Sequence, residues 1–192
     1  QKILPLIDEL LVKAQCKLTD LDVIGFGQGP GSFTGVRISV AIAQGLAYAA
    51  RLPLVGVSTL QMMAQQAFEQ DQANDVFSAI DARMGEIYYA HYKADNNGLM
   101  TLVDEEQVIK PELLTLPEMA ATAVGTGWQT YPALVTELAN VSLNEAILLP
   151  DAKYMLASIA TAYAHGDTVT AANAQPKYVR DTVTWKKLPG RE

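Results

Sequence analysis

Cysteine and histidine are scarce in this chain of 192 residues, and each scarcity excludes a class of site. Cys16 is the only cysteine, so an intrachain disulfide and a thiolate metal site are excluded, and a cytoplasmic location fits. The two histidines, His91 and His165, do not form the His-Glu-x-x-His pattern of zinc hydrolases. We therefore interpret both as surface or half-buried residues and predict no metal site.

Positive charge is also in short supply. The chain has 14 Lys and Arg residues against 21 Asp and Glu, which gives a net charge of −7. Proteins that hold nucleic acid on their own need clustered cations, so this balance argues against that class. The exception is the C-terminal end, which we interpret as a solvated tail that could support a partner holding RNA; its basic residues are Lys177, Arg180, Lys186, Lys187 and Arg191.

No hydrophobic run is long enough to cross a membrane, because residues 36–50 are interrupted by Arg37 and Gln44. With 49% hydrophobic and 18% charged residues the composition is globular, and the length fits one large domain or two small lobes. No signal peptide is recognisable. The chain opens at Gln1, without Met and inside an amphipathic pattern, so we expect its natural N-terminus to be missing.

Glycine, by contrast, is concentrated between residues 23 and 37. An apolar run over 23–26 predicts a strand, a glycine loop follows, and 36–50 predicts a helix. Such a layout presents backbone N–H groups to an anion. However, the loop lacks the lysine of a P-loop and the spacing of a dinucleotide motif. It carries Phe33 and Arg37 instead, and an exposed Phe33 favours a contact surface.

Two amphipathic helices are predicted beside this loop. In residues 1–14 the apolar residues recur at helical spacing, and in residues 36–50 Ile38, Ile42 and Leu46 form one stripe. Ala41 and Gly45 line the flank of that stripe, where small side chains allow another helix to approach closely. Either the core of the protein or a partner helix could fill this face.

The remaining pattern predicts a mixed α/β protein with two lobes, 1–72 and 73–192, divided at the polar run 69–75. A helix over 59–70 is capped by Ser58 or Thr59. Gly98 marks a hairpin turn, and Gly166 closes the last helix. The predicted strands are 54–57, 76–80, 86–92, 99–103 and 123–125, and the other predicted helices are 111–121, 131–138 and 154–165.

Three further features bear on a site. Asp81 ends a predicted strand beside Arg83, where the two could hold a cation–phosphate assembly or simply pair with each other. Gly125-Thr126-Gly127 predicts a second tight turn, so we expect a cleft between the lobes. Ser32 lies outside a Gly-x-Ser-x-Gly elbow, and we find no helper for it as a nucleophile.

Several motifs spread over the chain are more specific than single residues. The most specific is Gly29-Pro-Gly-Ser-Phe-Thr-Gly-Val-Arg37. The others are Leu52-Pro-Leu-Val-Gly-Val-Ser-Thr-Leu60, Ile80-Asp-Ala-Arg-Met-Gly-Glu-Ile-Tyr88, Val124-Gly-Thr-Gly127, Gln175-Pro-Lys-Tyr-Val-Arg180 and Trp185-Lys-Lys-Leu-Pro-Gly190. Together they resemble the TsaB (YeaZ) family of bacterial tRNA threonylcarbamoyladenosine proteins, over essentially the whole chain. That family begins with a β-hairpin carrying an Asp-Thr/Ser motif, which is absent before Gln1.

The resemblance implies an actin/Hsp70-like (ASKHA) fold and a non-catalytic subunit that binds and activates the catalytic relative TsaD, together with TsaE and ATP. The complex transfers threonylcarbamoyl to the adenosine beside the tRNA anticodon, so tRNA is reached indirectly. The resemblance also implies that the chain has no cofactor of its own, that a nucleotide could bind at the partner interface, and that the chain forms a homodimer in isolation. A stand-alone glycoprotease-like peptidase and a nucleotide-hydrolysing enzyme remain the alternatives.

Carried onto this chain, the family's partner surface lies on the first two helices. The implied partner-binding residues are Ile3, Leu6, Ile7, Leu10, Ile38, Ala41, Ile42, Gly45 and Leu46. The glycine loop and cleft comprise Gly29, Pro30, Gly31, Ser32, Phe33, Thr34, Gly35, Arg37, Asp81 and Arg83. We expect Gly45→Arg to abolish complex formation while the monomer stays folded.

Overall fold

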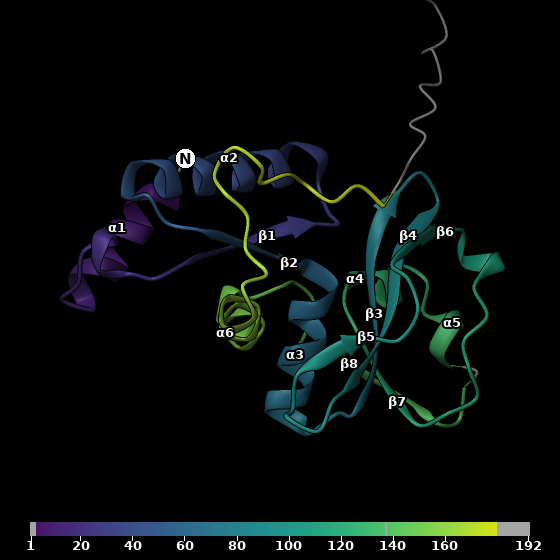
Figure 1. The fold of residues 1–192 in the computed structure, drawn as a ribbon. Coiled ribbons are helices and arrows are strands. Elements are labelled where there is room, and N and C mark those ends of the chain that lie inside the picture. Colours follow the sequence, from purple (N-terminus) through teal and green to yellow (C-terminus); the bar gives the residue numbers. More distant parts are fainter. Residues whose placement is uncertain (1–2, 137, 180–192) are drawn as a thin grey trace, which may run out of the picture.

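A computed structural model describes residues 3–136 and 138–179, which form two β-sheets flanked by helices (Figure 1). The helices are α1 (Ile3–Lys13), α2 (Phe33–Ala50), α3 (Thr59–Asp71), α4 (Thr126–Thr130), α5 (Ala133–Thr136) and α6 (Leu156–His165), with 3-10 turns η1 (Leu18–Asp20), η2 (Pro111–Leu113) and η3 (Ala152–Met155). The strands are β1 (Ile24–Gly29), β2 (Leu54–Ser58), β3 (Asp75–Arg83), β4 (Glu86–Ala94), β5 (Met100–Leu102), β6 (Gln107–Ile109), β7 (Ala121–Val124) and β8 (Val141–Asn144).

The smaller sheet pairs β1 with β2 in parallel, and α2 makes the crossover between them. Side chains alternate between the two faces of β2. Leu54 packs toward Val40 and Ala47 of α2, whereas the next residue, Val55, packs toward Ile159 of α6. The smaller sheet is therefore covered by a helix on each face.

The larger sheet has the order β5-β4-β3-β7-β8, and β6 also pairs with β4. Strand β3 is antiparallel to β4 and parallel to β7, so the sheet is mixed, as predicted. Leu60 and Met63 of α3 belong to the core on one face, and Trp128 of α4 belongs to the core on the other. The Trp128 indole donates a hydrogen bond to the Phe77 carbonyl at 3.0 Å, which satisfies its buried N–H.

Most elements with strong periodicity are confirmed. Helices α1 and α3, strand β2 and the β4–β5 hairpin lie where they were predicted. Ser58 caps α3 by accepting from the N–H of Leu60 at 3.1 Å. Gly166 closes α6 with φ of 77°, a left-handed conformation that glycine adopts at low cost.

Three predictions along the chain need correction. The helix over 111–121 is wrong, because the chain makes only η2 there and Pro117 interrupts further helix. The helix over 131–138 shortens to α5, and residue 137 lies outside the described part. Strands β6 and β8 were missed, since three or four residues are too few for a period-two pattern.

The glycine loop is much shorter than predicted. Strand β1 extends to Gly29 and α2 already begins at Phe33, so residues 30–32 alone connect them. Gly35 therefore lies in the first turn of the helix. Ser32 caps that turn, because its hydroxyl accepts from the N–H of Gly35 at 3.4 Å. The cap moves the start of the helix three residues upstream of the prediction.

The end of the described chain returns to the smaller sheet. Helix α6 packs on β2, and the N–H of Val169 donates to the Leu54 carbonyl at 2.9 Å. The N–H of Lys177 then donates to the Gln28 carbonyl at 2.8 Å. The division into lobes at residue 72 stays a prediction. The chain after residue 155 returns to the smaller sheet, which is formed by residues before 72. None of the helices in the described ranges is long and apolar enough to span a membrane.

Candidate functional site

Helix α1 presents an apolar surface that nothing in the described chain covers. None of its eleven described residues is buried, and 65% of the Leu10 side chain surface is exposed. Ile3 and Leu6 are also exposed, and Ile7 is half-buried. These exposed apolar residues are gathered on one helix rather than scattered singly over the surface, and their role in partner binding stays a prediction.

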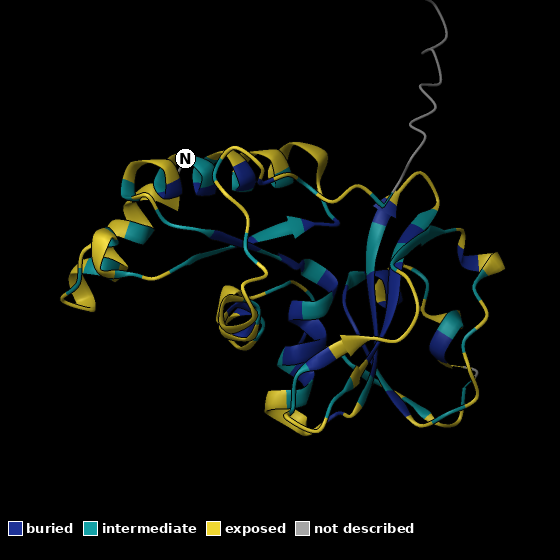
Figure 2. Ribbon diagram, viewed as in Figure 1, coloured by how far each residue is buried: buried dark blue, intermediate teal, exposed yellow. Residues whose placement is uncertain are grey.

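Helix α2 has a covered face and an open one. Val40, Ala43 and Ala47 are buried against the smaller sheet. On the opposite side, Ile38, Ala41, Gly45 and Tyr48 recur at helical spacing and are exposed, as Figure 2 shows for the outer side of α2. Ile42 and Leu46 are half-buried between the two faces.

Within the open face, Gly45 and Tyr48 contrast in size. Apart from the chain neighbours of Gly45 and the backbone of its own helix, no atom of the described residues lies within 4 Å of a Cβ built there, and Tyr48 is 82% exposed. The stripe therefore offers a gap at Gly45 beside a large ring, which suits close packing of another helix. Tyr48 was missed by the sequence analysis, although its spacing from Ala41 and Gly45 could have found it.

The first turn of α2 carries a cluster of Phe33, Arg37 and Tyr178. The Arg37 guanidinium carbon lies 3.3 Å from the centre of the Phe33 ring, and the Tyr178 ring centre lies 6.3 Å from it. Arg37 thus covers part of the Phe33 ring through a cation–π contact. Phe33 is still 58% exposed, so the cluster faces outward.

The short glycine loop is held from two sides. The Thr59 hydroxyl at the start of α3 donates to the Pro30 carbonyl. Gly29 has φ of 104°, and a Cβ there would lie 3.1 Å from the Lys177 carbonyl oxygen. A side chain at Gly29 would be strained in conformation and crowded by the C-terminal segment. The C-terminal segment therefore packs directly against the loop.

Asp81 and the turn at Gly125–Gly127 meet at the end of the larger sheet. The Asp81 carboxylate pairs with the Arg83 guanidinium at 3.0 Å, and the Asp81 backbone N–H donates to the Thr126 hydroxyl at 3.3 Å. A Cβ on Gly125 would lie 2.1 Å from the Ala79 carbonyl oxygen, so the close approach requires glycine. Asp81 and Arg83 pair with each other, which was the simpler of their two interpretations. A cleft shared with the glycine loop stays a prediction.

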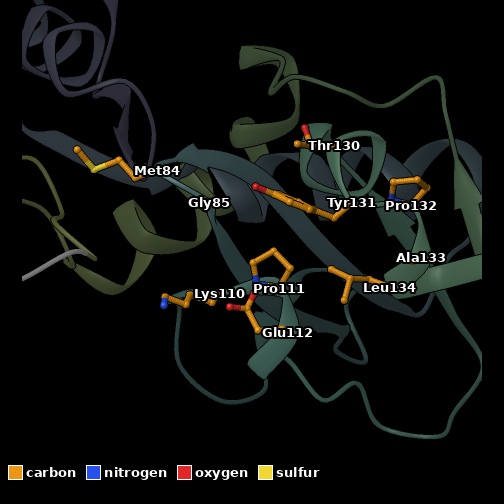
Figure 3. A pocket seen from close by; sticks show the side chains of 10 residues that line it. All are labelled: Met84, Gly85, Lys110, Pro111, Glu112, Thr130, Tyr131, Pro132, Ala133 and Leu134. Atoms are coloured by element: carbon orange, nitrogen blue, oxygen red, sulfur yellow. The ribbon is translucent and has the colours of Figure 1, made fainter.

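An open cavity of about 680 Å³ adjoins the β3–β4 turn (Figure 3). Tyr131 extends across it toward Gly85, with Pro111 lying below the ring. Arg83 and Met84 in the turn have φ of 63° and 58°, uncommon for residues other than glycine. The lining residues are Met84, Gly85, Lys110, Pro111, Glu112, Thr130, Tyr131, Pro132, Ala133 and Leu134. The sequence analysis missed this cavity, because its walls come from separate segments.

A buried carboxylate, Glu106, lies where the two sheets meet. One oxygen accepts from the Tyr92 hydroxyl at 2.6 Å and from the Ser58 hydroxyl, and the other lies 3.0 Å from Lys177 Nζ. Burial, and secondarily the negative charge of Glu106, raises the pKa of Tyr92, so this phenol stays protonated. The sequence analysis missed Glu106. Of the predicted basic tail only Lys177 is described; Arg180, Lys186, Lys187 and Arg191 lie outside the described residues.

Two side chains of types that can take part in catalysis, those of His91 and Ser32, make structural contacts. Within residues 3–136 and 138–179, no group of three or more His, Cys, Asp or Glu side chains could hold a metal ion. His91 pairs with Asp75 at 3.0 Å across β3 and β4, and Ser32 caps α2. The described chain presents two helices with open apolar faces, and a glycine loop at the start of the second one.

Comparison with known proteins places this geometry in context. A family model described as "TsaD: tRNA N6-adenosine threonylcarbamoyltransferase" matches residues 1–186. The chain is 46% identical to "tRNA threonylcarbamoyladenosine biosynthesis protein TsaB" of Escherichia coli over 196 residues, which cover all of this chain and 85% of that protein. The protein of the same name from Haemophilus influenzae is 43% identical over all of this chain and 84% of its own length.

Solved structures give the same result for the fold. "YeaZ from Pseudomonas aeruginosa" superposes with a TM-score of 0.84 at 39% identity, over 93% of this chain and 84% of that one. A second structure, titled "an uncharacterized protein with similarity to peptidase YEAZ" from the same organism, gives 0.86 at 40% identity over 94% and 83%. Together with the family model, these likenesses confirm the predicted fold class.

Proposed function

Because the chain belongs to the TsaB family, we propose that it serves in the biosynthesis of threonylcarbamoyladenosine in tRNA, as a partner subunit without a catalytic centre of its own. The names of its relatives in Escherichia coli and Haemophilus influenzae support the pathway. The partner role is supported by what the surface offers, which is apolar area for docking rather than a constellation of reactive groups.

The observation that carries this proposal is the open apolar layer on α1 and α2. The proposed partner is the catalytic relative TsaD, whose helices would pack on this layer, with TsaE joining the complex. Burial of exposed side chains such as Leu10 and Ile38 would supply the driving force, at about 25 cal/mol per Å² of apolar surface. In the absence of that partner, a second copy of the chain would cover the same residues, so we expect a homodimer in isolation.

The glycine loop is proposed to line a composite site at the partner interface. It lies at the N-terminus of α2, where unpaired N–H groups favour an anion. A nucleotide bound between the two subunits would have its nearest contact with this chain there. The chain reaches tRNA through the complex, in keeping with its net charge of −7.

The alternatives are a peptidase and a nucleotide-hydrolysing enzyme. For the peptidase, Ser32 would have to leave its capping bond to Gly35 and acquire a base. Calorimetry of the isolated chain with ATP and magnesium tests for the nucleotide-hydrolysing enzyme. If the chain is a partner subunit, we expect it to bind ATP weakly or not at all on its own. Strong binding followed by hydrolysis would favour the enzyme.

Reconstitution of tRNA modification tests the proposal directly. TsaD, TsaE, ATP, the threonylcarbamoyl donor and unmodified tRNA are incubated with and without this chain, and the modified nucleoside is quantified by mass spectrometry. We expect modification only when the chain is present. Equal modification by TsaD and TsaE alone would contradict the partner role. A third mixture contains this chain but omits TsaD, and modification there would assign the catalysis to this chain.

A further inference from the structure

The last described segment of the chain ties the two sheets to the first turn of α2. After α6 it runs beside α2 and on to the larger sheet, as the yellow trace in Figure 1 shows. Along this path Val169 bonds to Leu54, and the Gln44 amide donates to the Ala174 carbonyl at 3.0 Å. The segment is thus fixed to β2 and then to α2 before it reaches the glycine loop.

Lys177 makes the decisive contacts at the far end of this segment. Its backbone N–H donates to the Gln28 carbonyl, and its own carbonyl lies against Gly29. Its ammonium lies 3.0 Å from the Glu106 carboxylate, whose side chain is only 1% exposed. One residue therefore holds the end of β1 with its backbone and the larger sheet with its charge. The next residue, Tyr178, packs on Phe33 and Arg37.

We propose that the Lys177–Glu106 ion pair positions the glycine loop and the first turn of α2, and that it thereby couples the larger sheet to the partner-binding layer. Among the described residues, the other groups bonded to Glu106 are the hydroxyls of Tyr92 and Ser58, which donate hydrogen bonds but bring no positive charge. Loss of the Lys177 ammonium leaves a nearly buried carboxylate without its cation, and such a charge draws in water. The segment then separates from Glu106, and Tyr178 no longer covers Phe33.

Hydrogen exchange of the isolated chain tests this coupling without any partner. In Lys177→Met and in Glu106→Gln, we expect the amides of residues 36 and 177 to exchange at least about tenfold faster than in the wild type, because the half-exposed Lys177 side chain (46%) no longer anchors the segment to the buried Glu106 carboxylate. Lys177→Arg keeps the charge and should restore slow exchange. The free-energy change calculated from the exchange rates of the double variant should be smaller than the sum of the changes in the two single variants, which is the signature of a direct interaction.

Matched controls separate this effect from a general loss of stability. Val135→Ala removes buried volume on the far face of the larger sheet, and Lys153→Met removes an exposed lysine. Neither should accelerate exchange selectively at Val36. Unchanged exchange in both single variants, or the same uniform increase as in Val135→Ala, would overturn the inference.

The link to the partner rests on the proposed function and is measured separately. Titration of TsaD with the same variants should show about tenfold weaker binding for Lys177→Met, with Lys177→Arg near the wild type. If the wild-type chain does not bind TsaD, the proposed function fails while the exchange data still decide whether the pair holds the loop. If TsaD binds every variant equally although exchange has changed, the coupling to the partner surface is wrong.

Discussion

Helices α1 and α3 are similar in length, yet the more apolar of the two is the one left uncovered. Seven of the eleven residues of α1 are Ile, Leu or Val, and none of the eleven is buried. Helix α3 has more polar residues, including Gln65, but buries six side chains, of which four belong to the core beneath the larger sheet: Leu60, Met63, Ala64 and Ala67. Gln65 is satisfied there, because its amide donates to the Gly98 carbonyl at 3.0 Å and accepts from the Met100 N–H at 2.9 Å.

The difference shows that burial follows from topology rather than from hydrophobicity alone. Helix α3 connects β2 to β3 of the larger sheet, so one face of that sheet packs on the helix and covers it. Helix α1 and the outer face of α2 have no such layer above them in the described chain. An apolar face that the described chain leaves exposed is stabilised when another molecule covers it. This uncovered face is the physical basis of the proposed partner role.

The largest expected effect is the loss of partner binding on Gly45→Arg. The monomer has open space at this position, so the variant should fold normally. In the complex, however, the guanidinium would be buried without a counter-charge, at a cost on the order of 4 kcal/mol. Co-purification with TsaD measures this loss. Ala164→Arg on α6, also an exposed helical position, is the matched control and should bind normally; unchanged binding by Gly45→Arg would place the interface elsewhere.

On the covered helix, Met63→Ala should act on stability instead. Met63 is fully buried between α3 and the larger sheet. Its truncation leaves a cavity and should lower the free energy of unfolding by about 3 kcal/mol. Urea denaturation followed by circular dichroism gives this value. A change below about 0.5 kcal/mol, the level of ordinary surface substitutions, would contradict the description of α3 as core.

A smaller loss is expected at the start of the same helix. Ser58 caps α3 and also donates to Glu106. Ser58→Ala should destabilise the chain by about 1.5 kcal/mol, since it removes the cap and leaves Glu106 with one fewer donor. Thermal unfolding compares it with Ser58→Thr, which retains a capping hydroxyl. Equal melting temperatures for the wild type and Ser58→Ala would refute the cap.

The smallest effect on stability is expected for Leu10→Ala on α1. Because Leu10 is mostly exposed, its truncation should change the free energy of unfolding of the isolated monomer by less than about 0.5 kcal/mol. Binding to TsaD should nevertheless weaken. Urea denaturation and a binding titration on the same sample separate the two readouts. A large loss of stability would mean that α1 is covered within the chain, and the contrast with α3 would disappear.

Prediction from the sequence succeeded where the signal is local. The 3.6-residue period of α1 and α3, the Ser58 cap and the left-handed Gly166 each depend on residues within one or two turns. It failed at 111–121, where apolar residues read as a helix but Leu114 and Leu116 instead pack as irregular chain on the core of the larger sheet. It also placed the start of α2 too late, because glycines at 29, 31 and 35 disguised the Ser32 cap.

The candidate site divides in the same way. The shared face of Ile38, Ala41 and Gly45 on α2 could be predicted because helical spacing depends on neighbouring residues, but the spacing left open whether the core or a partner covers that face. Glu106 could not, since its partners Ser58 and Lys177 lie 48 residues before it and 71 residues after it. A single carboxylate in a polar stretch carries no local sign that three distant segments will close around it.

By itself, therefore, the sequence determined the α/β class, the two amphipathic helices, the glycine loop and, through its motifs, the family. Each of these follows from short-range periodicity, turn chemistry or a contiguous motif. The tertiary structure alone decided which apolar faces are covered, which cation meets Glu106 and how the C-terminal segment holds the glycine loop. Those outcomes depend on the order in which strands join a sheet, and contacts between residues far apart in the chain are set by that order.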